Sequence, residues 1–158
     1  MSTIQARVSI QRPVEQVFAF YRDPANMPSF LGDVMASEAL DSATFRWTVQ
    51  GPLGIRVHSR LRVTEERTNE LIRYETIGTP GLSAQWEISF ATGSMTGETE
   101  VRSKMNVPLG KLGIAALALM GKFPADEQSA NLHRLKQLLE TGRVTDTSYA
   151  VAGKFGGA

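Results

Sequence analysis

The sequence predicts an α+β fold in which a curved antiparallel sheet of about seven strands packs against a long C-terminal helix. Three observations favour this fold. Residues 3–10 alternate between polar and apolar, residues 34–107 repeat that alternation with turn signals between segments, and residues 112–142 return to the apolar spacing of a helix. Because strands joined by short turns pair antiparallel, the middle of the chain is expected to form a meander.

Two short helices are expected after the first strand. Pro13 suits the first turn of a helix, and apolar residues recur at helical spacing from Val14 to Tyr21. Asp23 before Pro24 is an N-cap signal for a second helix, whose length Pro28 limits.

The strand signals of the middle region are separated by glycine and proline. Gly51 to Gly54 predicts the turn of a hairpin, and Thr79 to Gly81 and Gly93 to Gly97 mark two further breaks. The segment from Leu82 to Phe90 has the cleanest alternation, and Val101 to Val107 follows it as the last strand.

The C-terminal region predicts a helix with an interruption. Leu112 to Phe123 has helical spacing, Pro124 removes a backbone donor, and a second helical stretch ends at Gly142. The Gly-, Thr- and Ser-containing segment 143–158 is expected to be a flexible tail, so the predicted domain covers residues 1–142.

Composition excludes several classes of protein. The net charge of +1, with 17 Lys and Arg against 16 Asp and Glu, disfavours a nucleic-acid partner. The absence of cysteine excludes disulfides and thiol chemistry. No apolar stretch reaches the roughly 20 residues that span a bilayer, and Met1 to Gln11 lacks a signal peptide, so a cytoplasmic location is expected.

Four segments carry a resemblance to a known family. They are Val8 to Phe20, Asp23 to Phe30, Trp47 to Gly54 and Asn131 to Gly142, and they occur in the family's order. On these residues the chain resembles the START-like (Bet v 1-like, SRPBCC) superfamily, in particular its polyketide cyclase/dehydrase branch. It departs from the branch at Phe30 and Tyr74, where members often carry tryptophan. The resemblance implies a helix-grip fold with a deep internal cavity, used for carrying lipids or quinones, for aromatic cyclisation or for sensing small molecules.

The alternation indicates which side chains face such a cavity. Its ligand is expected to be mainly apolar, because the inward side chains carry few polar atoms. The alternative, that these side chains simply pack as core, stays open. The predicted ligand-binding residues are Phe18, Tyr21, Phe30, Phe45, Trp47, Val57, Leu61, Tyr74, Trp86, Phe90, Met105, Leu112, Ala116, Leu119 and Met120.

Catalytic signals are weak. His58 falls on the outer face of its strand, His133 lies on the polar side of the last helix, and neither spacing suits a metal. No carboxylate pair is expected on an inward face. Tyr74 is the best candidate for a general acid, but no catalytic residue, metal or cofactor is predicted.

Two surface features admit other interpretations. Arg56, His58, Arg60 and Arg62 form a row that attracts an anionic membrane or partner, or else pairs with glutamates on neighbouring strands. The stretch from Leu112 to Met120 is apolar nearly all round, so it is either buried on both sides or a gate that contacts lipid transiently.

The leading hypothesis is a single-domain protein that binds a hydrophobic small molecule such as a lipid, quinone or aromatic polyketide without reacting with it. One alternative is a cyclase or dehydratase that uses the same cavity. Another is a protein-interaction module without a ligand. No oligomeric state is predicted.

Overall fold

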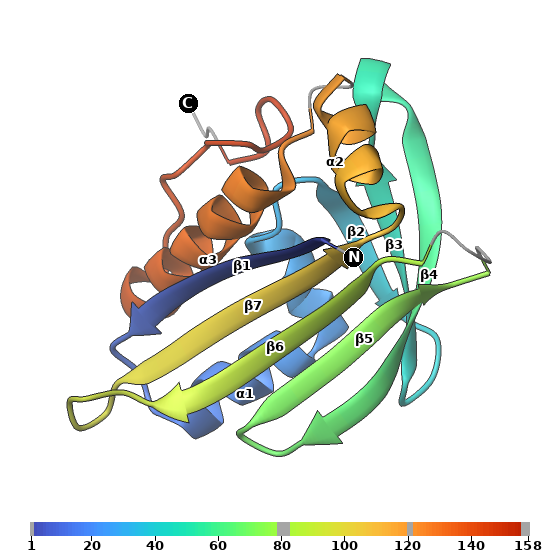
Figure 1. Ribbon diagram of the computed structural model, residues 1–158. Coiled ribbons are helices and arrows are strands. Elements are labelled where there is room, and N and C mark those ends of the chain that lie inside the picture. The colour runs from blue at the N-terminus through green and yellow to red at the C-terminus, as the bar shows by residue number, and fades with distance from the viewer. Residues whose placement is uncertain (1, 79–82, 120–121, 156–158) are drawn as a thin grey trace.

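The computed structural model describes residues 2–78, 83–119 and 122–155, and it confirms the predicted α+β fold. Within these residues one antiparallel sheet has the strand order β1-β7-β6-β5-β4-β3-β2 (Figure 1). From β2 to β7, strands that follow one another in sequence are neighbours in the sheet. β1 lies beside β7 and forms one edge of the sheet, and β2 forms the other. The strands are β1 (Ser2–Ile10), β2 (Val34–Ala39), β3 (Thr44–Gln50), β4 (Arg56–Arg67), β5 (Leu71–Ile77), β6 (Gln85–Thr92) and β7 (Thr99–Val107).

The helices follow the breaks expected from proline and glycine. The second predicted helix is a 3-10 helix, in which the Asp23 carboxylate accepts the backbone N–H of Ala25 at 3.0 Å. The last helix ends at Gly142, whose φ of 76° lets its N–H donate to Leu138 O at 2.9 Å. The helical segments are α1 (Val14–Arg22), η1 (Pro24–Ser29), η2 (Pro52–Gly54), α2 (Gly110–Leu119) and α3 (Pro124–Thr141).

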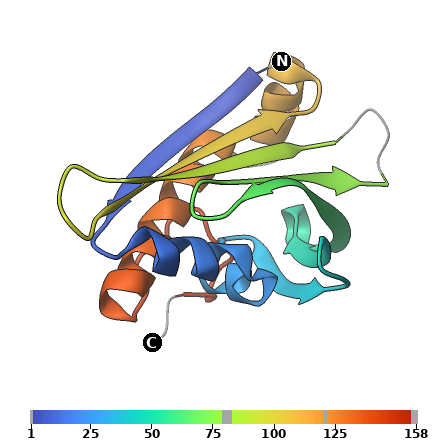
Figure 2. The same ribbon diagram turned by 90° about the horizontal axis from the view of Figure 1, so that it is seen from below.

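The sheet curves around one face, and the helices α1 and α3 lie on that face (Figure 2). The pairing register shifts between Val63 and Glu65 in β4 and between Val34 and Ala36 in β2. Such bulges bend a strand and increase its twist. The concave face therefore has room for both helices and for the side chains between them.

Alternation along the strands separates a buried face from a charged one. Phe45, Leu61 and Ile88 are almost fully buried on the concave side. On the outer face Arg62 pairs with Glu75 at 3.2 Å, and Arg73 pairs with Glu87 at 2.6 Å. Of the predicted row, Arg62 therefore pairs with a glutamate on a neighbouring strand, whereas Glu87 pairs with Arg73 of β5 and not with a member of the row.

Candidate functional site

A cavity of about 180 Å³ lies between the concave face of the sheet, the start of α3 and one side of α2. It has an aromatic floor and a polar end. The residues that line it are Tyr21, Leu31, Asp33, Val34, Trp47, Tyr74, Trp86, Met105, Leu117, Lys122, Pro124, Glu127, Gln128 and Asn131.

The aromatic floor consists of Trp47, Tyr74 and Trp86. Tyr74 and Trp86 occupy paired positions on β5 and β6, and their rings stack with centroids 5.1 Å apart and an interplanar angle of 13°. Trp47 meets Trp86 edge-on at 5.4 Å, and its indole N–H donates to the sulfur of Met27 at 3.2 Å. Because that donor is already used inside the protein, Trp47 offers the cavity an apolar surface.

Tyr21 and Tyr74 both line the cavity, and each phenol influences how the other titrates. Burial raises the pKa of Tyr21 to about 12. Burial, together with the neighbouring Tyr21, also raises the pKa of Tyr74 well above its ordinary value. Both phenols therefore stay protonated at neutral pH, and Tyr74 is a weaker acid than a free tyrosine.

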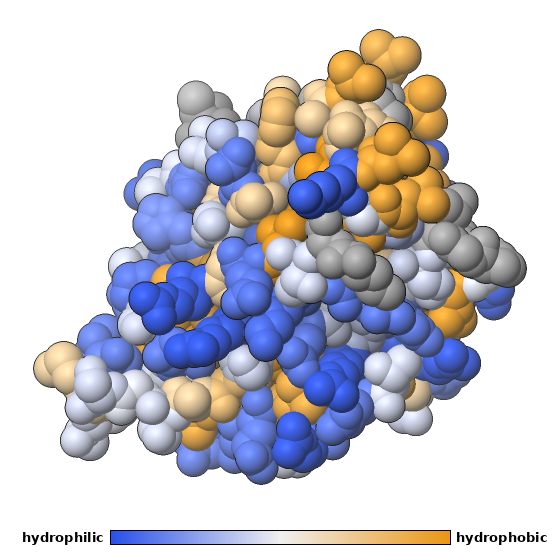
Figure 3. All heavy atoms as spheres, viewed as in Figure 1, coloured by the Kyte–Doolittle hydropathy of each residue, from blue (hydrophilic) through white to orange (hydrophobic). Residues whose placement is uncertain are grey.

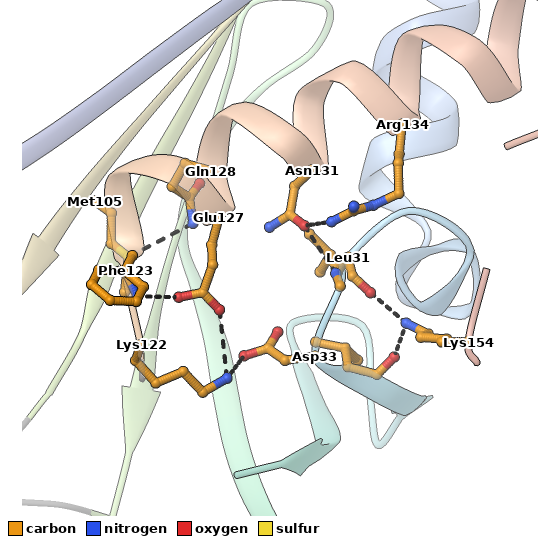
Figure 4. Close-up of polar contacts among 12 residues, drawn as sticks. Leu31, Asp33, Met105, Lys122, Phe123, Glu127, Gln128, Asn131, Arg134 and Lys154 are labelled. Atoms are coloured by element: carbon orange, nitrogen blue, oxygen red, sulfur yellow. Dashed lines mark hydrogen bonds and ion pairs between the residues drawn. The ribbon is translucent and has the colours of Figure 1, made fainter. Parts of the chain in front are cut away.

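The polar end consists of Asp33, Lys122 and Glu127 (Figure 4). The Lys122 ammonium lies 3.4 Å from Asp33 Oδ2 and 3.5 Å from Glu127 Oε1. Glu127 also accepts the backbone N–H of Phe123 at 3.0 Å, which caps the first turn of α3. The three charges thus come from the loop before β2, the residues preceding α3 and α3 itself.

Partial burial and neighbouring charges change the pKa values of Glu127 and Lys122. Burial raises the pKa of Glu127; Lys122 opposes this shift and the charge of Asp33 adds to it, leaving the pKa above its ordinary value. Burial alone would lower the pKa of Lys122, but Asp33 and Glu127 raise it overall. Lys122 is therefore cationic at neutral pH, and Glu127 holds a proton at higher pH than a free glutamate.

Two amides on α3 complete the polar lining. Asn131 Oδ1 accepts from the backbone N–H of Gly32 at 2.9 Å and from Arg134 Nη2 at 2.6 Å. In Figure 4 its amide nitrogen points away from Arg134, toward the side on which Glu127 lies. Gln128 Oε1 accepts from the Ser103 hydroxyl at 2.7 Å. A ligand in the cavity therefore meets fixed amide groups beside the three charges.

The loop that carries Leu31 and Asp33 is held from behind by the C-terminal segment. Lys154 Nζ donates to Leu31 O and, at 2.5 Å, to Val34 O. The backbone N–H of Val151 donates to Gly32 O at 3.0 Å. The domain boundary at residue 142 and the flexibility of residues 143–158 stay predictions. In the described part of the chain, the segment that carries Val151 and Lys154 supports one wall of the cavity.

The Lys154 contact predicts a pH dependence of stability. Burial lowers the pKa of Lys154 to about 8, from an ordinary value of 10.5. Between these values the unfolded chain binds a proton that the folded chain has released, so the free energy of unfolding rises with pH across this window. The neutral amine keeps two donors for its two carbonyl partners. We compare the free energy of unfolding of wild type with that of Lys154→Met. The difference, wild type minus variant, should increase by roughly 1–2 kcal/mol from pH 8 to pH 10. This is less than the full pKa shift implies, because Lys154 is partly exposed to solvent.

Urea denaturation of the two proteins at each pH measures this difference. Lys111→Met, which removes an exposed lysine from α2, is the matched control and should show no such increase. A difference for Lys154→Met that stays constant across the window would contradict the prediction.

The structure brings five of the predicted ligand-binding residues together in the cavity, and Met120 lies outside the described residues. Phe18, Phe30, Phe45, Leu61 and Phe90 are buried core side chains that do not line the cavity. Val57, Leu112, Ala116 and Leu119 are exposed instead of facing inward. The five cavity residues are Tyr21, Trp47, Tyr74, Trp86 and Met105.

The polar end is what the sequence interpretation missed. The expectation that no carboxylate pair faces inward is wrong, because Asp33 and Glu127 both line the cavity. A signal for part of this end exists in the sequence. Gln128 and Asn131 continue the stripe of Leu135 and Leu139 toward the start of α3, so polar residues occupy its inward face there.

The described residues contain no group of His, Asp and Glu side chains that could hold a metal ion. Across residues 2–78, 83–119 and 122–155, no helix combines the length and apolar character needed to cross a membrane.

In the helix-grip class of proteins, a curved antiparallel sheet wraps around a C-terminal helix, and an internal cavity lies between the two. This chain has that arrangement. Residues 1–140 match the family described as polyketide cyclase / dehydrase and lipid transport, and the chain belongs to this family. Membership supports a ligand-binding or cyclase role. No curated protein sequence matches the chain.

Solved structures share this fold. DR_A0006 from Deinococcus radiodurans is 23% identical, with a TM-score of 0.69 over 89% of this chain and 99% of that chain. DynU16, a protein of the dynemicin biosynthetic locus, is 20% identical, with a TM-score of 0.62 over 92% of this chain and 51% of that chain. CalU16 from Micromonospora echinospora is 9% identical, with a TM-score of 0.61 over 92% of this chain and 78% of that chain. At these identities the similarity concerns the fold.

Proposed function

We propose that this protein binds a small, mainly apolar molecule of one or two rings in the cavity, with one polar group of the ligand at the polar end. The observation that carries the proposal is a cavity of about 180 Å³ with stacked aromatic rings at one side and Lys122, Asp33 and Glu127 at the other. Apolar protein cavities of about 150 Å³ bind benzene, so this volume suits an aromatic or quinone ring system better than a long lipid chain.

The arrangement disfavours an anionic ligand. Asp33 and Glu127 share the ammonium group of Lys122, so an anion would add a third negative charge to a half-buried site. A carbonyl or hydroxyl oxygen can instead accept a hydrogen bond from Lys122 or from the amide of Asn131. The ring of such a ligand then packs against Trp86 and Tyr74.

Tryptophan fluorescence tests the proposal directly. The chain contains two tryptophans, Trp47 and Trp86, and both line the cavity. Adding 2-naphthol, a neutral two-ring phenol, should quench their emission saturably. Trp86→Ala should weaken binding by at least about tenfold, because the ligand loses a stacking partner and buried area. Calorimetry of this variant measures the loss.

Tyr149→Ala, which removes a half-exposed aromatic side chain outside the cavity lining, is the control and should bind 2-naphthol normally. The proposal fails if 2-naphthol gives no saturable signal and native mass spectrometry of the purified protein finds no apolar molecule bound.

A second candidate function is a cyclase or dehydratase, and Glu127 favours it. A carboxyl group with a raised pKa, lining an apolar cavity beside a lysine, is suited to general acid–base catalysis. In a dehydration, Lys122 would hold the carbonyl oxygen of a β-hydroxy ketone. Glu127 would take the proton from the carbon next to that carbonyl and pass it to the hydroxyl on the following carbon, which would leave as water while the carbon–carbon double bond forms.

A β-hydroxy ketone that carries a phenyl ring tests this candidate, because its dehydration gives a conjugated enone with strong ultraviolet absorbance. Wild type should form the enone, and Glu127→Gln should slow the reaction about 100- to 10,000-fold while still binding 2-naphthol. Binding of 2-naphthol without any turnover of the ketone leaves the carrier as the better description.

A further inference from the structure

The exposed apolar side chains of this protein are concentrated on two segments. Ten large hydrophobic side chains are exposed among the described residues, and six of them belong to η2 with the start of β4 or to α2 with the residue before it. In Figure 1 both segments lie at the upper end of the molecule, and Figure 3 shows hydrophobic residues gathered there. We call this surface the apolar end; it consists of Leu53, Ile55, Val57, Leu109, Leu112 and Leu119.

The side chains of the apolar end are exposed over large fractions of their surface. Leu53 is 97% exposed, Leu112 74% and Leu119 91%. Single exposed leucines are common on soluble proteins, but a cluster of this kind marks an interaction surface. Within α2, Gly113 is buried and Leu117 lines the cavity, while most of the other apolar residues face outward.

The charges within the two chain segments that form the apolar end all have one sign. Residues 44–64 and 101–125 contain no aspartate or glutamate, although together they carry several arginines and lysines. Arg56 lies between Ile55 and Val57, Lys111 lies next to Leu112, and both cations are exposed. Proteins bind anionic membranes by combining two contributions. Leucines enter the acyl boundary of the bilayer, and neighbouring cations contact the phosphate headgroups.

We propose that the apolar end docks on a lipid bilayer that contains anionic lipids. The charge pattern argues against a second copy of the chain as the occupant, because a two-fold dimer through this surface would bring Arg56 and Lys111 toward like charges. Docking does not depend on the proposed ligand. Since Leu117 belongs to the same helix and lines the cavity, docking would also place the cavity wall next to the lipid.

Co-sedimentation with vesicles tests the proposal. Wild type should bind vesicles of phosphatidylcholine mixed with phosphatidylglycerol more tightly than vesicles of phosphatidylcholine alone. The variant Leu112→Asn with Leu119→Asn should lower the partition coefficient at least about tenfold, because two leucines no longer enter the bilayer. Both side chains are exposed, so circular dichroism and the melting temperature should match wild type.

Met95→Gln is the matched control, since Met95 is 62% exposed in the turn between β6 and β7, at the opposite end of the molecule in Figure 1. It should bind vesicles like wild type. Arg56→Gln with Lys111→Gln should weaken binding to the mixed vesicles by about fivefold for each charge removed, and should leave binding to pure phosphatidylcholine unchanged.

Three outcomes would overturn the proposal. One is wild-type protein that sediments with neither kind of vesicle. Another is a fall in binding for Met95→Gln as large as that for the leucine variant. The third is a wild-type dimer, detected by analytical ultracentrifugation, that the leucine variant dissociates, since the apolar end would then join two copies of the chain.

Discussion

Replacing Arg134 by methionine is expected to lower the free energy of unfolding by about 3–5 kcal/mol, because two buried acceptors and one partly buried acceptor lose a charged donor. The Arg134 side chain is fully buried. Nε donates to Phe30 O at 2.8 Å, Nη1 to Ser148 O at 2.6 Å, and Nη2 to Asn131 Oδ1 at 2.6 Å. Methionine fills similar space but donates to none of these oxygens, of which, among the described residues, Asn131 Oδ1 alone keeps another donor, the backbone N–H of Gly32. Urea denaturation, monitored by circular dichroism, measures the loss.

Arg143→Met is the matched control for this prediction. Arg143 is exposed just after α3, and its replacement should change stability by less than about 0.5 kcal/mol. Arg134→Lys should fall between the two, since an ammonium group keeps the charge but cannot reach three separate acceptors in the same geometry. If Arg134→Met costs no more than Arg143→Met, the guanidinium does not hold the C-terminal segment against the loop before β2.

Replacing Leu117 by tryptophan is expected to weaken 2-naphthol binding about a hundredfold. Leu117 is half-buried and lines the cavity from α2. The larger side chain would occupy much of the space of about 180 Å³ while its outer part stays at the surface, so the domain should still fold. Isothermal titration calorimetry gives the affinity without interference from the added indole.

Leu119→Trp makes the same chemical change two residues further along α2. Leu119 is 91% exposed and does not line the cavity, so this variant should bind 2-naphthol like wild type. Equal affinities for the two variants would mean that the ligand does not occupy the cavity beneath α2, and a melting temperature lowered in Leu117→Trp alone would assign its lost binding to damage of the fold.

The strands and the aromatic floor could be predicted because side-chain direction in a strand follows directly from sequence parity. Trp47, Tyr74 and Trp86 each sit in an alternating segment, so they share the concave face once the strands pair in a meander. Helix boundaries near Pro124 and Gly142 were predictable for a similar local reason, since proline and glycine restrict or free the backbone at single positions.

The helices were harder to orient. The spacing of α2 is apolar nearly all round, so it does not reveal which side turns inward, and the structure selects Leu117 over Leu112, Ala116 and Leu119. That choice depends on how α2 packs beside β7 and β1. The polar end was harder still, because Asp33 lies almost ninety residues before Lys122 and in a separate part of the fold.

Strand periodicity, proline and glycine act locally, so the residues alone predict the order of the elements, the antiparallel sheet and the aromatic side chains on its concave face. The size of the cavity, the meeting of Asp33, Lys122 and Glu127, and the support of the Asp33 loop by the C-terminal segment appear only in the packed fold. These features depend on distances between segments far apart in the chain, which curvature and helix packing set and which no local pattern encodes.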